Sequence, residues 1–154
     1  MSALAVQPPP ATIARQRFDE LERAMMRCPQ GEAIIRHVFT PGLYCREMSA
    51  AAGQIITSKI HRTEHPFVLS KGRILVADEE GNSVEICAPF MGITKPGTRR
   101  AAIVLEDVVW TTFHPTDLTD VDQIEAAIIE PHAEHLDGLA QPPALAKECA
   151  ACLG

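Results

Sequence analysis

The stretch from residue 34 to residue 114 constrains the fold most, because it consists of short apolar runs separated by turn residues. The runs are rich in Val, Ile and Thr, which favour β-strands, and pairs such as Pro41-Gly42 and Pro96-Gly97 interrupt them. We expect strands near residues 34–39, 43–49, 54–60, 66–71, 73–78, 83–88, 91–94, 99–105 and 108–113. Many short strands at even spacing, with no long helical stretch between them, predict an all-β sandwich or barrel.

Helical patterns flank this block on both sides. After an extended arm at residues 1–10, which ends in three prolines, apolar residues recur at helical spacing and predict an N-terminal helix at 11–28. The barrel occupies 34–114, and a C-terminal helix and tail follow at 119–154. The second helix is expected at 121–130, where Pro131 stops it.

Composition limits the classes of function. A chain of 154 residues makes one ordinary domain, and its net charge of −6 argues against a nucleic-acid-binding surface. No apolar run approaches the roughly 20 residues that span a bilayer, and the N-terminus has no signal-peptide pattern. Five scattered cysteines suit reduced thiols. We therefore predict a cytoplasmic protein with no nucleic-acid or membrane partner.

The segment Gly53–Gly72 carries two closely spaced histidines, and its spacing resembles the first motif of the cupin superfamily, G-x5-H-x-H-x3-E-x6-G. Lys59 stands at the first histidine position, His61 at the second, and His65 at the glutamate position. The resemblance implies a cupin jelly-roll, a double-stranded β-helix barrel with flanking N- and C-terminal α-helices. It also implies a homodimer, because cupins commonly pair through sheet edges or strand exchange.

A second stretch, ITKPGTRRAAIV, resembles the second cupin motif, P-x-G-x2-H-x3-N. When the two are aligned on Gly97, Arg100 takes the histidine position and Val104 the asparagine position. The runs HVFTPGLYCREMSAAAG and EDVVWTTFHPTD are similar to small cupin-like proteins of bacteriophages and prophages. The resemblance covers about residues 34–114.

The resemblance implies that the four motif positions point inward and bind a divalent metal (Fe, Mn, Ni or Zn). Of the four positions, only those of His61 and His65 hold a residue type that usually binds metal. Lys59 and Arg100 are cations, and an arginine cannot lose its proton to become a ligand. Glu64, on the adjoining loop, is the expected third ligand. His114 ends a strand antiparallel to the one that carries His61, so we expect it at the opposite rim. The alternative is a pocket without metal.

The two cations that replace motif histidines, Lys59 and Arg100, suggest an anion-binding pocket. Lys59 and Arg100 would join His61 and His65 at one barrel mouth, and a carboxylate or phosphate would be attracted there. Trp110 could supply a flat apolar wall, and its alternative role is plain core. The leading hypothesis is a small-molecule-binding cupin of phage or prophage origin. The alternatives are a metal-dependent enzyme (an isomerase or a dioxygenase) and an interaction protein that uses the barrel as a dimeric scaffold.

Other motifs are weaker. Cys149 and Cys152 have CxxC spacing, but the second pair of a zinc site is missing. A zinc site shared across a dimer is one role for them. His132 and His135 follow Pro131 among carboxylates, where we expect a solvated face.

Overall fold

The computed structural model describes the backbone of residues 10–131 and the side chains from Arg15 onward. The predicted arm before Pro10, the tail at 132–154, and the Cys149/Cys152 pair therefore lie outside the described residues. Within the described part, no helix is long and apolar enough to cross a membrane.

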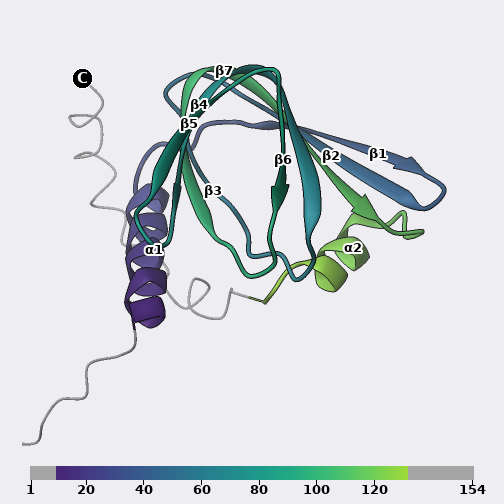
Figure 1. The fold of residues 1–154 in the computed structure, drawn as a ribbon, viewed down its shortest axis with the longest axis horizontal. Coiled ribbons are helices and arrows are strands. Elements are labelled where there is room, and N and C mark those ends of the chain that lie inside the picture. Colours follow the sequence, from purple (N-terminus) through teal and green to yellow (C-terminus); the bar gives the residue numbers. More distant parts are fainter. Residues whose placement is uncertain (1–9, 132–154) are drawn as a thin grey trace, which may run out of the picture.

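The described chain is an antiparallel sheet that curls into a barrel, with one helix before it and one after it (Figure 1). The strands are β1 (Ile34–Thr40), β2 (Leu43–Ala50), β3 (Ile55–Thr57), β4 (His65–Asp78), β5 (Ser83–Cys87), β6 (Phe90–Thr94) and β7 (Arg100–Pro115). They follow the order β1-β2-β7-β4-β5, with β3 paired to β7 and β6 paired to β4. The predicted all-β barrel with flanking helices is confirmed.

The two longest strands, β4 and β7, form the centre of the sheet. The predicted breaks at Gly72 and at Glu106-Asp107 are wrong, because each strand continues through its break as an irregularity of the ladder. Gly72 has φ +83° and lies directly against the Asp107 carbonyl, so the strands bend there without separating. The bend lets both strands wrap around one core, which consists of Ala50, Leu69, Ile74, Val76, Ile86, Val104 and Val108.

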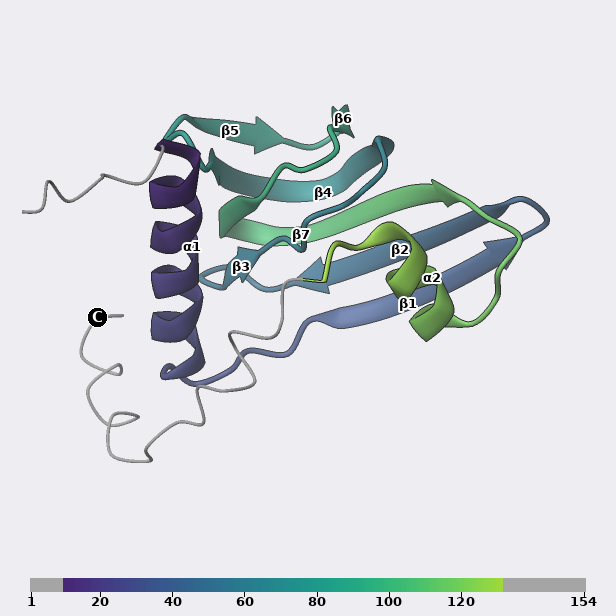
Figure 2. The ribbon, with the colours of Figure 1, turned by 90° about the horizontal axis from the view of Figure 1, so that it is seen from below.

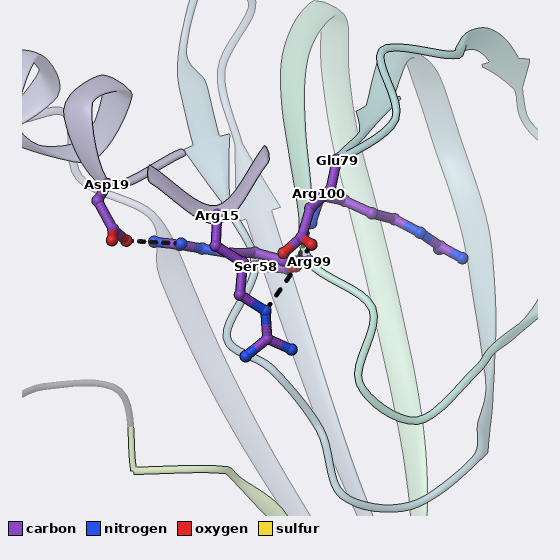
Figure 3. A network of polar contacts seen from close by, with 6 residues as sticks. All are labelled: Arg15, Asp19, Ser58, Glu79, Arg99 and Arg100. Atoms are coloured by element: carbon purple, nitrogen blue, oxygen red, sulfur yellow. Dashed lines mark hydrogen bonds and ion pairs between the residues drawn. The ribbon is translucent and has the colours of Figure 1, made fainter. Parts of the chain in front are cut away.

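Helix α1 (Pro10–Met26) packs at one end of the sheet (Figure 2) and is held by a buried arginine. Arg99 is 1% exposed and makes ion pairs with Asp19 at 2.7 Å and Glu22 at 2.6 Å. Figure 3 shows the contact between Arg99 and Asp19. The Arg99 guanidinium also lies 5.5 Å from the ring centre of Phe18. A buried cation needs such partners, and removing one partner of a buried pair typically costs about 3–5 kcal/mol.

Helix α2 (Val121–Ile128) begins at Asp120, whose side chain accepts a hydrogen bond from the Gln123 backbone N–H at 2.9 Å. The residues after it pair with the loop between β3 and β4. The Arg62 N–H donates to the Ile128 carbonyl and the Glu130 N–H donates to the Ile60 carbonyl, each at 2.8 Å. The C-terminal helix is thereby fixed beside the loop that carries His61.

Substitution of Gly72 by alanine tests the bend between β4 and β7. We expect Gly72→Ala to lower the free energy of unfolding by about 2–5 kcal/mol, because a positive φ costs about 1–2 kcal/mol and the methyl group would collide with the Asp107 carbonyl. Gly81→Ala is the matched control, since Gly81 has φ +88° but open space around it, and it should lose only about 1–2 kcal/mol. Urea unfolding measures both, and equal losses would contradict the close approach.

Candidate histidine centre

Three histidines meet inside the barrel and form what we call the histidine cluster: His61, His65 and His114. Their ring centres are separated by 4.3 Å (His61–His65), 4.4 Å (His65–His114) and 5.4 Å (His61–His114). One ligand nitrogen from each lies within 4.8 Å of the other two. His65 and His114 are each 2% exposed, so the cluster is largely shielded from solvent.

The strand arrangement brings these residues together. His65 begins β4 and His114 lies near the end of β7, and an antiparallel pairing places the start of one strand beside the end of the other. The expectation that His114 lies at the opposite rim is therefore wrong. It compared His114 with β3, but β3 ends at Thr57, and the following loop carries His61 across to the start of β4.

The hydrogen bonds of the cluster leave lone pairs available. His65 Nδ1 contacts the Thr63 carbonyl at 3.2 Å, and because a carbonyl only accepts, Nδ1 carries the proton and Nε2 keeps a lone pair. His114 Nε2 contacts the Thr112 hydroxyl at 3.1 Å. The Nδ1 atoms of His61 and His114 are buried and have no hydrogen-bond partner among the described residues.

All three imidazoles are held in the neutral form. Burial, with a smaller contribution from the neighbouring His65, lowers the pKa of His61 to about 4 and that of His114 to about 3. Burial also lowers the pKa of His65, and nearby Arg100 adds to the effect. Neutral imidazole is the form that binds metals, so the cluster is ready to bind one at neutral pH.

The cluster also fits a metal in its dimensions. Two nitrogens bound to one tetrahedral zinc ion lie about 3.4 Å apart, and those of the cluster lie within 4.8 Å of one another, so inward rotation of the side chains would be needed to hold an ion. The unpartnered Nδ1 atoms of His61 and His114 are the kind of buried polar atom that a metal would satisfy.

The cluster lies in the wall of a cavity of about 240 Å³, which we call the pocket. Its cationic side chains are Arg46, Lys59 and Arg100, and its single carboxylate among the described lining residues is Glu125. The apolar part of the wall includes Met48, Ile56, Ile74, Val76, Ala102, Trp110, Ile128 and Ile129. The pocket therefore combines metal-ligating, cationic and apolar surfaces.

The structure places some of the site residues predicted from the sequence in the pocket and others at its edge or outside it. His61, His65 and Arg100 face the pocket, as does Trp110, which stacks on Phe67 with ring centres 4.1 Å apart. Lys59 lies at the pocket's edge, exposed and bonded to Glu125 at 2.8 Å. Glu64, the expected third ligand, is exposed, pairs with Lys95 and is outside the histidine cluster.

Arg46 and Tyr44 also line the pocket, although no sequence motif singled them out. On β2, Tyr44 and Arg46 pair with His114 and Thr112 of β7, so all four side chains share the inner face. Tyr44 stacks on His114, with ring centres 5.9 Å apart, and hydrogen-bonds to His37 at 2.7 Å. The sequence signal that could have found them is the alternation Tyr-x-Arg-x-Met, which places these side chains on one face of a strand beside Trp-x-Thr-x-His.

Comparison with known proteins shows the fold. No protein-family model matches the chain. No curated protein matches it significantly in sequence either. A Klebsiella pneumoniae protein with a double-stranded β-helix domain matches in structure with a TM-score of 0.50 and 21% identity, over 60% of this chain and 84% of that one.

Two further solved structures are similar. A cupin superfamily protein of Desulfitobacterium hafniense has a TM-score of 0.48 and 6% identity, over 58% of this chain and 82% of its own. A cupin-2 domain protein of Shewanella frigidimarina has a TM-score of 0.46 and 11% identity, over 64% and 92%. The likeness to the Klebsiella protein shows the predicted double-stranded β-helix fold. Its phage or prophage origin, its cytoplasmic location and its dimeric state stay predictions.

The lowered histidine pKa values predict how the metal-free protein responds to acid. Below pH 6.5 these histidines bind protons in the unfolded chain but stay neutral in the folded cluster. The free energy of unfolding should therefore fall as the pH drops from 7 towards 4. His114→Gln should remove about one proton from this difference and make the pH dependence shallower. Urea unfolding in EDTA at pH 7 and pH 5 measures it.

The control is His37→Gln, which removes an exposed histidine of β1 outside the pocket. It should keep the pH dependence of the unaltered protein. If His114→Gln shows the same acid sensitivity as His37→Gln, the cluster is not held neutral by burial.

Proposed function

We propose that this protein binds a small molecule in the pocket, at a divalent metal ion held by the histidine cluster. The observation that carries the proposal is the convergence of three neutral imidazoles, with unused lone pairs, at the wall of a cavity. Imidazole ligands suit zinc, iron and nickel. Manganese is the fourth candidate metal that the sequence resemblance implies.

The number of protein ligands supports a ligand-binding centre. Structural zinc sites are usually closed by four protein ligands, whereas sites that act on a bound molecule keep a position open. Among the described residues the cluster contains three histidines and no carboxylate. A metal ion there would supply Lewis-acid polarisation of a ligand's oxygen atoms.

The chain's own residues would orient such a centre. The Thr63 carbonyl fixes the proton of His65 on Nδ1, and Thr112 holds the ring of His114. Trp110, which lines the pocket and stacks on Phe67 at an interplanar angle of 10°, supplies a flat apolar wall. The open position also supports the second hypothesis, a metal-dependent isomerase or dioxygenase, in which the same residues would position a substrate.

Metal binding can be measured directly. We expect the protein, after EDTA treatment and desalting, to bind about one Zn²⁺, Mn²⁺, Ni²⁺ or Fe²⁺ per chain in calorimetric titration. His65→Gln and His114→Gln should each weaken binding by at least about 100-fold, because each removes one of three ligands.

Two control variants separate the cluster from its surroundings. Glu64→Gln should bind metal normally, because the Glu64 carboxylate pairs with Lys95 outside the cluster. His37→Gln should also bind normally, because His37 does not line the pocket and is linked to the cluster only through its hydrogen bond to Tyr44. The proposal fails if none of the four ions binds, or if Glu64→Gln loses the metal while His114→Gln keeps it.

A further inference from the structure

The pocket has more positive charge than its own carboxylate can balance. Arg46, Lys59 and Arg100 line it, and Glu125 is the single carboxylate among its described lining residues. Glu125 is already bonded to Lys59 at 2.8 Å. Arg46 and Arg100 have no carboxylate partner in the part of the chain that the structure describes, and an arginine cannot shed its charge.

Several arginines outside the pocket do have a carboxylate partner. Arg36 is bonded through two nitrogens to Glu47, each at 3.0 Å, and Arg73 pairs with Glu85 at 3.0 Å. The contrast is clearest between neighbours, because Arg99 and Arg100 point in opposite directions from the chain (Figure 3). Arg99 is neutralised by two carboxylates of α1, whereas Arg100 lines the pocket without one.

The two unpaired arginines approach the cluster from different strands. Arg46 lies on β2 opposite Thr112, two residues before His114 along β7. Arg100 begins β7, and its guanidinium lies 5.9 Å from the ring centre of Phe67. Both arginines line the same pocket as His61, His65 and His114. Both cations therefore lie near the cluster.

The remaining wall limits the ligand's size and character. The cavity of about 240 Å³ is smaller than the roughly 300–1,000 Å³ typical of pockets for drug-sized molecules. The rest of the pocket's wall is mostly apolar, and Trp110 presents a flat ring. A compact molecule with charged ends and a short carbon skeleton complements this arrangement.

We propose that the ligand of the pocket is a compact organic acid with two anionic groups, one paired with Arg46 and the other with Arg100. This proposal rests on the proposed function, because it names the class of molecule bound at the histidine cluster. Guanidinium groups pair with carboxylates and phosphates through two parallel hydrogen bonds, so either kind of anionic group fits.

Calorimetric titration of the metal-loaded protein, freed of excess metal, tests this proposal with matched acids. Succinate carries two carboxylates and butyrate, of the same carbon number, carries one, while phosphoglycolate combines a phosphate with a carboxylate. We expect succinate or phosphoglycolate to bind at least roughly tenfold more tightly than butyrate, since the second charged hydrogen-bonded pair adds affinity. Whichever acid binds identifies the second anionic group.

Variants locate the effect. Arg46→Gln and Arg100→Gln should each bring the diacid-to-monoacid preference close to one, whereas Arg36→Gln should keep it, because Arg36 is paired outside the pocket. The preference in the unaltered protein is itself a test that requires no variant. Equal binding of diacid and monoacid, no binding by either diacid, or a preference that survives Arg46→Gln and Arg100→Gln overturns the proposal.

The same titration on metal-free protein distinguishes the two proposals. If the histidine cluster binds metal but diacids are not preferred, the ligand class is wrong and the metal centre stands. If no metal binds but diacids are preferred in an arginine-dependent way, the metal centre is wrong and the ligand class stands.

Discussion

The pairing of β4 with β7 is the interaction on which the rest of the structure depends. The two strands, of 14 and 16 residues, run antiparallel along most of their lengths. Because they are antiparallel, the start of β4 meets the end of β7, which places His65 beside His114. Because they also bend at Gly72, the start of β7 curves back and brings Arg100 close to Phe67. One ladder therefore assembles residues that are nearly 50 positions apart in sequence.

Histidine and arginine respond differently to the same buried environment, and the pocket uses both responses. Burial lowers the pKa of His61, His65 and His114, neighbouring charged groups add to the effect, and the three rings are left neutral. Arg46 and Arg100 cannot respond in this way, so their charge remains in the pocket. The pocket wall therefore carries three neutral imidazoles and two permanent positive charges.

The sequence predicted the fold well because strand periodicity and glycine spacing are local signals. It placed His61, His65 and Arg100 in one pocket, since motif spacing and the alternation of a strand determine which side chains point inward. It misplaced His114 and missed Arg46, because their positions depend on which strands pair and in which register. It also assigned Glu64 inward, although the loop turns that carboxylate towards Lys95. Short loops without periodicity give no such signal.

The two cupin-motif positions that hold a cation here, Lys59 and Arg100, now have separate physical explanations. Lys59 turns to Glu125 of α2, which removes it from the ligand set and ties the loop before β4 to the C-terminal helix. His61 pairs with Ile129 in a bridge immediately after the same helix, so α2 also fixes the backbone of a cluster residue. Arg100 keeps its inward position but has a charge where the motif has a ligand. The third imidazole comes instead from His114 on β7. Helix α2 is therefore part of the site, because without it neither Lys59 nor the loop that carries His61 would have its observed contacts.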